Sequence, residues 1–131
     1  MRVMIDTNVL VSALMFPGQT IDKMMQKVTS EHSLVLSSYV IDELKDVTQR
    51  KFPDKVEVVD TLLSQLPYEL VQTPDQPKPG LFTIRDSKDY PVLYSAVSEK
   101  VDVFITGDDD FNEVDVEKPE ILTPADFVSK Y

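Results

Sequence analysis

Acidic residues that follow short apolar runs are the part of this sequence best suited to chemistry. Asp6 comes directly after Val3-Met4-Ile5, and Asp108 follows Val103-Phe104-Ile105 after a Thr106-Gly107 turn. Apolar runs of this length suit buried strands, and in parallel sheets ligands bind at the edge where the carboxyl ends of the strands meet. The sequence therefore predicts that the carboxylates of Asp6 and Asp108 reach the same edge of one sheet.

A further acid, Glu43, lies in a segment with a helical pattern. At about 100° per residue, the apolar positions of this segment form one stripe, made of Val40, Ile41, Leu44 and Val47. Asp42 and Asp46 lie well round toward solvent, whereas Glu43 flanks the stripe. Glu43 can therefore lean over the edge of the sheet, although a glutamate at such a boundary is also compatible with an ordinary surface position.

Two more acids, Asp86 and Asp89, precede a helix whose first turn is marked by Pro91. One of these aspartates, or Ser87 between them, is expected to cap that helix. A single cap accounts for one acid and leaves the other free for chemistry.

Simpler roles exist for the acids at the strand ends. Asp6 on its own would also suit the cap of the helix that follows it, and Asp109 suits a solvated turn. A calcium-binding EF-hand loop that begins at Asp108 is excluded, because its required glycine would be Glu113 and its closing glutamate Pro119.

The composition narrows the chemistry that these acids can perform. The chain has no cysteine and one histidine, His32, so a bound metal would need oxygen ligands, which select hard cations such as Mg²⁺, Mn²⁺ or Ca²⁺. Several carboxylates near one crevice repel strongly unless cations neutralise them. Two cations about 4 Å apart would clamp the attacking and leaving oxygens of a phosphodiester and lower the pKa of a bound water. That chemistry needs no protein nucleophile.

The elements that must position the acids alternate along the chain. Short apolar runs are expected as strands at Val3–Ile5, Leu34–Leu36, Glu69–Val71, Val101–Ile105 and Glu120–Leu122. Helical patterns lie at Asn8–Met15, Ile21–Ser30, Tyr39–Arg50, Asp54–Leu66, Pro91–Lys100 and Pro124–Lys130. This alternation predicts an α/β fold with a parallel sheet covered on both faces. The 131 residues suit a single domain, with residues 73–80 as a loop inside it.

Taken in order, these segments resemble the motifs of the PIN-domain family. Val3–Leu10 resembles the opening motif, and Tyr39–Val47, with Glu43, is similar to the second. Arg85–Asp89 and the helix after it look like the third motif, and Ile105–Phe111 resembles the fourth. The order and spacing fit along essentially the whole chain, and the first and fourth motifs are the most specific.

The resemblance implies a three-layer α/β/α fold with a five-stranded parallel sheet of order 3-2-1-4-5. It also implies Mg²⁺- or Mn²⁺-dependent ribonuclease activity. Carried over by position, the catalytic, metal-binding acids would be Asp6, Glu43, Asp89 and Asp108, with Asp110 as a further metal ligand. The residues that would support these ligands or position water and substrate are Asn8, Thr106 and Asp86.

The resemblance also implies partners. Many bacterial members of the family are the toxin of a toxin–antitoxin pair, usually oligomeric and inhibited by a small partner, and this sequence looks closest to that branch. An RNA substrate, an antitoxin protein and a homodimer are therefore expected. The apolar residues expected to be exposed for such contacts are Phe16, Met24, Met25 and Tyr39.

The charge of the chain opposes a nucleic-acid partner. A net charge of −10 contrasts with the basic face that phosphate binding normally needs, although acids gathered at a metal site would weaken this objection. The basic residues that could meet a backbone are Arg85 and Lys88 beside the third motif, and Lys45, Arg50, Lys51 and Lys55. Tyr90 stands where relatives often carry a small or polar residue, which predicts a different rim for the site.

Two other functions remain open from the sequence. A phosphatase of the haloacid-dehalogenase type would use Asp6 as nucleophile, but its acid/base position falls on Asn8, which cannot supply a proton, and the chain is short for that fold. A catalytically inactive RNA- or protein-binding module would keep the fold, although all four matching acids are present. The N-terminal segment has no signal-peptide cleavage pattern and no apolar stretch long enough for a membrane span, so we expect a cytoplasmic protein.

Overall fold

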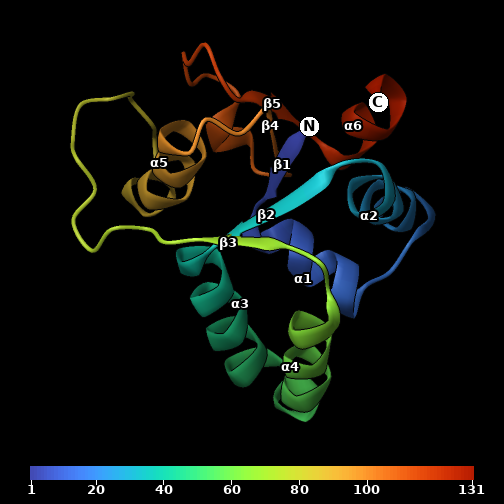
Figure 1. Ribbon diagram of the computed structural model, residues 1–131. Coiled ribbons are helices and arrows are strands. Elements are labelled where there is room, and N and C mark those ends of the chain that lie inside the picture. The colour runs from blue at the N-terminus through green and yellow to red at the C-terminus, as the bar shows by residue number, and fades with distance from the viewer.

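The computed structural model describes residues 1–131 and contains a five-stranded sheet. Its strands are β1 (Arg2–Ile5), β2 (Ser33–Ser37), β3 (Glu69–Val71), β4 (Val103–Ile105) and β5 (Glu120–Leu122). All neighbouring strands pair in parallel, in the order β3-β2-β1-β4-β5 (Figure 1). This confirms the sheet and the strand order that the PIN resemblance implies.

Helices cover the sheet on both faces. They are α1 (Thr7–Met15), α2 (Gln19–Glu31), α3 (Ser38–Lys51), α4 (Val56–Gln65), α5 (Tyr90–Ser98) and α6 (Pro124–Lys130). Three short 3₁₀ turns lie at Pro53–Lys55, Ser87–Asp89 and Asp109–Phe111. Figure 1 shows α5 on one side of the sheet and α2 and α6 on the other. None of the helices combines the length and the apolar character needed to cross a membrane.

Each predicted helix and strand is present, and β3, β5 and α6 have the predicted ends, whereas the others are shifted. The strand expected from Val101 begins at Val103, because a turn that follows the end of α5 at Ser98 includes Val101. Lys100 adopts a left-handed conformation with φ of 55°, and the amide of Val101 donates to the carbonyl of Ala96. Val101 therefore belongs to the turn after α5, and Asp102 lies in a bend between that turn and the strand.

The connections reverse direction between β1 and β4. From β1 the chain steps outward through β2 to β3, then crosses back to β4 and continues outward to β5 on the other side. In open α/β sheets the ligand crevice lies at such a switch point, beyond the carboxyl ends of the strands. The residues that follow β1 and β4 at this point are Asp6 and Thr106.

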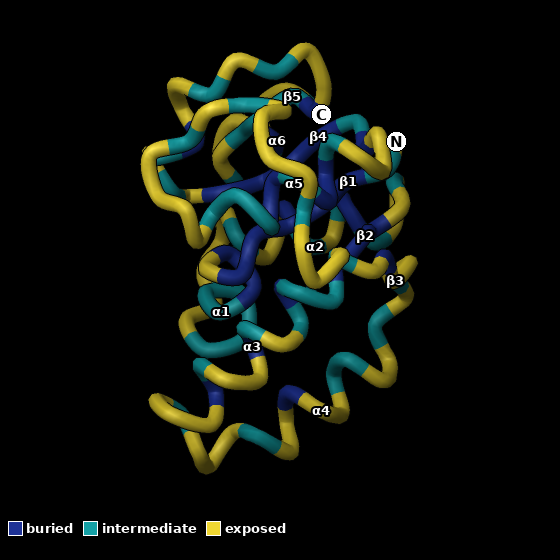
Figure 2. The backbone as a smooth tube through the Cα atoms, turned by 90° about the vertical axis from the view of Figure 1, so that its left-hand side faces the viewer, coloured by how far each residue is buried: buried dark blue, intermediate teal, exposed yellow.

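The central strands form the core of the molecule. A cluster of 23 buried hydrophobic residues surrounds them, and Figure 2 shows the buried colour along β1 and β4. The helix α2 packs on this core through Met24 and Val28, both fully buried. The expectation that Met24 is an exposed contact residue is therefore wrong, because it lies on the core side of α2. Phe16, in contrast, is 63% exposed.

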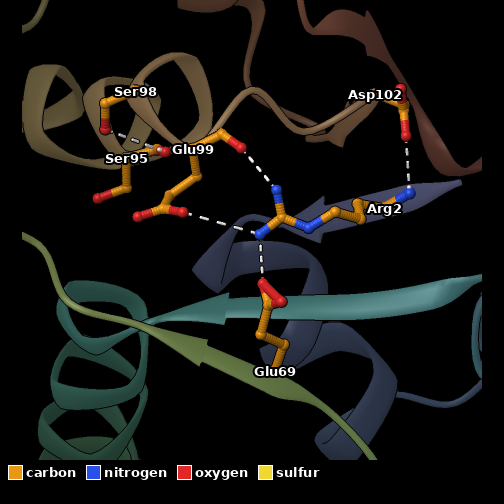
Figure 3. A network of polar contacts seen from close by, with 6 residues as sticks. All are labelled: Arg2, Glu69, Ser95, Ser98, Glu99 and Asp102. Atoms are coloured by element: carbon orange, nitrogen blue, oxygen red, sulfur yellow. Dashed lines mark hydrogen bonds and ion pairs between the residues drawn. The ribbon is translucent and has the colours of Figure 1, made fainter.

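A polar network joins the strands at the opposite edge of the sheet, where β1 begins. The guanidinium of Arg2 forms an ion pair with Glu69 at the start of β3 and donates to the carbonyl of Glu99 just after α5 (Figure 3). The backbone amide of Arg2 donates to Asp102, at 2.8 Å, just before β4. Arg2 thus connects elements on both sides of β1, far from the edge that carries Asp6.

Candidate metal centre

Asp6 lies at the carboxyl end of β1, where the sequence predicted it. Its amide donates to the carbonyl of Ile105 in the neighbouring strand, and the residue is only 6% exposed. One carboxylate oxygen accepts from the amide of Thr7 at 2.8 Å, so Asp6 also caps α1. Burial raises the pKa of this carboxyl to about 6. The hydrogen bonds from Thr106 and Thr7 lower the pKa in part, and repulsion from the charges of Glu43 and Asp108 raises it further.

Thr106 connects the two strand ends. Its buried hydroxyl donates to Oδ2 of Asp6 at 2.8 Å and accepts from the amide of Asp108 at 3.0 Å. The carboxylate of Asp108 in turn accepts from the amide of Asp110 at 2.9 Å and so begins the 3₁₀ turn. Phe111 anchors that turn by packing edge-on against Phe104 of β4, with ring centroids 5.2 Å apart. The positions of Asp6 and Asp108 are therefore fixed relative to each other.

Asp89 comes to the same region from the start of α5. Asp86 accepts from the amide of Lys88 at 3.0 Å and caps the 3₁₀ turn that leads into α5, whereas the side chain of Asp89 makes no capping bond. One oxygen of Asp89 is buried without a hydrogen-bond partner. Burial raises the pKa of Asp89 to about 7, with further repulsion from the carboxylates of Asp108, Asp86, Asp6 and Asp110.

The closest group of acids joins two of the 3₁₀ turns. Asp86, Asp89 and Asp110 each place one carboxylate oxygen within 4.8 Å of the others. Arg85 lies beside this group and contacts Asp110 at 3.4 Å, with a side chain that is 71% exposed. Asp86 belongs to this tight group although its position in the motif implied only a supporting role.

Glu43 faces the cluster from α3. The helix is capped by Ser37, whose hydroxyl accepts from the amide of Val40, and it buries Val40 and Leu44 against the core. Glu43 is half-buried, whereas Asp42, the residue before it, is exposed. The charge of Glu43 contributes to the raised pKa of Asp6, so the two carboxylates are electrostatic neighbours.

Tyr39 is a residue at this site that sequence reasoning assigned elsewhere. Its hydroxyl donates to the carbonyl of Lys88 at 3.3 Å, which joins α3 to the turn before α5. Burial is the main cause that raises the pKa of this phenol, and the negative charges of Glu43, Asp89 and Asp86 raise it further. Tyr39 lies four residues before Glu43, on the same helix face, and this spacing could have indicated its place at the site. The apolar ring instead suggested a contact with a partner protein. Asn8, by contrast, is exposed at the start of α1.

The residues present fit a divalent cation. The donor atoms near the switch point are carboxylate oxygens, which suit hard cations and offer nothing for soft metals. A buried carboxylate oxygen without a partner is costly unless something binds it, and Asp89 has such an oxygen. A cation would also offset the repulsion that raises the pKa of Asp6 and Asp89.

The sequence of residues 2–110 matches the family described as PIN domain. The chain belongs to the PIN-domain family. A solved structure with a similar fold is a chain in the crystal structure of VapBC2 from Rickettsia felis bound to a DNA fragment from their promoter. The two chains superimpose with a TM-score of 0.70 and share 16% identity, and the match covers 92% of this PIN domain and 97% of that chain. No curated protein matches the sequence.

Family membership changes the choice between the functions left open by the sequence. Membership of the PIN-domain family argues against the haloacid-dehalogenase type of phosphatase, in which Asp6 would attack phosphate directly. The likeness to the Rickettsia felis chain concerns the fold alone at this identity. The acids that carry the PIN motifs also converge on one edge of this PIN domain's sheet, with Thr106 between Asp6 and Asp108.

Proposed function

We propose that this PIN domain is a metal-dependent endoribonuclease that hydrolyses phosphodiester bonds in single-stranded or structured RNA. The observation that carries the proposal is the convergence of carboxylates at the switch point, with a buried and unpartnered oxygen on Asp89. Family membership supports it, because the matched residues include every acid of the cluster. We take residues 1–131 as one domain, which the shared core of 23 buried residues supports.

The residues that would hold Mg²⁺ or Mn²⁺ are Asp6, Glu43, Asp89 and Asp108, with Asp110 as a further ligand. Bound cations would supply charge stabilisation for the phosphodiester and a lowered pKa for water. In this assignment the carboxylates bind the ion and the supporting residues orient them. Those supporting residues are Asn8, Thr106 and Asp86.

The contribution of the chain's own residues is largely preorganisation. Thr106 holds Asp6 in one orientation and fixes the amide of Asp108, so two ligands from distant parts of the sequence keep a constant separation. Groups that orient ligands in this way typically change metal affinity or activity by about 10- to 100-fold. Asp86 and Tyr39 hold the turn that carries Asp89.

Cleavage of a labelled single-stranded RNA, compared in Mg²⁺, Mn²⁺ and EDTA, tests the proposal. We expect cutting only with a divalent cation, and loss of cutting in Asp6→Asn. Asp109→Asn is the matched control, since Asp109 is exposed and lies in the same acidic run. RNA cleavage that persists both in EDTA and in Asp6→Asn would refute the mechanism. Release of phosphate from a small phosphomonoester without any RNA cleavage would restore the phosphatase alternative.

We further propose that the protein is the cytoplasmic toxin of a toxin–antitoxin pair and forms a homodimer. The family branch that the sequence resembles supports this, as does the likeness in fold to a chain of the VapBC2 structure. Induced expression in bacteria is expected to arrest growth, and co-expression of a short gene directly upstream is expected to restore it. Unchanged growth on induction of the active nuclease would argue against a toxin. Sedimentation of the purified protein tests the dimer.

A further inference from the structure

A pocket of about 500 Å³ lies beside the start of α5. The segment 72–86 runs out from β3 and returns alongside α5 (Figure 1). Phe82 and Ile84 of this segment line the pocket together with Ser87, Tyr90 and Pro91. Ser87 stands between Asp86 and Asp89 in the chain, so the pocket adjoins the candidate metal centre.

Aromatic rings form one wall of this pocket. Phe82 stacks on Tyr90 with ring centroids 4.5 Å apart and an interplanar angle of 21°, and Tyr90 lies 6.1 Å from Tyr94. The hydroxyl of Tyr90 donates to the carbonyl of Lys78 at 2.6 Å and accepts from the amide of Leu81 at 3.3 Å. The segment is therefore held around Tyr90 at two points, and the wall exists before a ligand arrives.

The charge of the protein explains why such a wall matters for RNA. A net charge of −10 opposes RNA binding by neutralisation of phosphates, so a second source of affinity is needed. The cations next to the lining residues in the chain are Lys78, Arg85 and Lys88, and Arg85 is paired with Asp110. Stacking of a base on an aromatic ring contributes affinity independently of protein charge and tolerates every base.

We propose that this pocket is a nucleobase subsite, which binds one nucleoside unit of the RNA next to the phosphodiester at the metal centre. Phe82 provides the stacking surface, and Thr83 and Ser87, which also line the pocket, offer hydroxyls for the edge of the base. A volume of about 500 Å³ is within the range of small-molecule pockets. The subsite rests on the proposed function, since it assumes that RNA is the substrate.

Binding of a fluorescently labelled single-stranded RNA in EDTA tests the subsite without cleavage. We expect Phe82→Ala to weaken binding about tenfold, within the range for loss of one stacked base, and Phe82→Trp to retain it. Leu81→Ala is the matched control, because Leu81 is 47% exposed in the same segment and its side chain does not line the pocket. With these three cations near the pocket, the slope of log K against log salt is expected at about −2.

A second set of RNAs, each with one abasic position, separates stacking from a general effect on folding. For wild type, removal of one particular base is expected to weaken binding about tenfold, and for Phe82→Ala the same removal is expected to have no further effect. Three results would overturn the subsite. One is an equal loss of binding affinity in both proteins at every abasic position, another is equal affinity of Phe82→Ala and wild type, and the third is no RNA binding by wild type. Base-dependent binding in EDTA, together with no cleavage of the same RNA in Mg²⁺ or Mn²⁺, would overturn the proposed nuclease and leave the subsite standing.

Discussion

The hydroxyl of Thr106 donates a 2.8 Å hydrogen bond to Oδ2 of Asp6, across 100 residues of sequence. The same hydroxyl accepts from the amide of Asp108. One side chain at the switch point of the sheet therefore sets the orientation of one acid and the backbone position of another. This link makes Thr106 the residue whose replacement should most clearly separate the geometry of the site from its charge.

Replacement of Thr106 by valine keeps the shape of the side chain and removes the hydroxyl. We expect Thr106→Val to lower Mn²⁺ affinity and RNA cleavage by about 10- to 100-fold, because Asp6 and the amide of Asp108 both lose a partner. Thr106→Ser restores the hydroxyl and is expected to stay within about threefold of wild type. Calorimetric titration with Mn²⁺ measures the affinity, and equal behaviour of both variants would contradict the positioning role.

The raised pKa values of Asp6 and Asp89 predict how stability depends on pH without divalent cations. The pKa values of Asp6 and Asp89 are about 6 and about 7 in the folded protein, so the folded protein keeps protons that the unfolded chain releases near the ordinary pKa of 3.8. Stability is therefore lost as the pH rises from about 4 to about 7, and a titration from about pH 5 to 8 covers the later part of this loss. We expect a decrease on the order of 1–3 kcal/mol in the free energy of unfolding over this titration, measured by urea denaturation in EDTA, because solvent screening reduces the contribution of the partly exposed Asp89.

Two comparisons isolate this effect. Asp102 and Glu120 have lowered pKa values because of their hydrogen bonds, so they are ionised throughout this window and do not contribute. Asp89→Asn is expected to flatten the pH dependence and to be more stable than wild type at pH 8, whereas saturating Mg²⁺ should restore the stability of wild type alone. A wild-type protein that gains stability in EDTA between pH 5 and 8 would show that the two acids are not held as described.

The strands and the acids at their ends were predictable because both follow from local patterns. Short apolar runs mark strands buried on both faces, and Asp6 and Thr106 follow two of these runs directly. The stripe around Leu44 likewise placed Glu43 at a half-buried position. The strand order came from the family resemblance, since no local pattern states which strands are neighbours.

Other features of the site depend on segments without a hydrophobic period. The tight group that includes Asp86, the ion pair of Arg85 with Asp110, and the hydrogen bond from Tyr39 to Lys88 all result from the path of the segment before α5. That path is fixed by tertiary contacts such as the bonds of Tyr90, which a sequence pattern does not reveal. Met24 was placed on the wrong face because α2 is amphipathic and its partner surface was unknown.

Glu43 can be tested against its neighbour in the same helix. We expect Glu43→Gln to lower RNA cleavage by on the order of 10²-fold, because it removes a charge beside Asp6. Asp42→Asn removes an equal charge from an exposed position and is expected to cleave within about twofold of wild type. Initial rates at saturating Mg²⁺ provide the comparison. A similar loss in both variants would indicate a general effect of surface charge.

Replacement of Arg2 tests the reverse case, in which the stability of the protein changes and the metal centre does not. We expect Arg2→Ala to lower the free energy of unfolding by about 1 kcal/mol, since its ion pairs with Glu69 and Glu99 are partly exposed and screened. Its distance from the acids along β1 predicts unchanged Mn²⁺ affinity. Urea denaturation and Mn²⁺ titration of the same preparation measure both quantities, and a loss of Mn²⁺ affinity would show that the two edges of the sheet are coupled.

The most direct test of the account is the position of Mn²⁺ in crystals of the protein, located by anomalous diffraction. We predict a peak at the switch point, about 2.0–2.6 Å from carboxylate oxygens of Asp6, Asp89 or Asp108. The peak should be lost in Asp89→Asn. If crystals at saturating Mn²⁺ show no peak at these carboxylates, or show peaks only elsewhere on the molecule, the assignment of this cluster as a metal centre is contradicted.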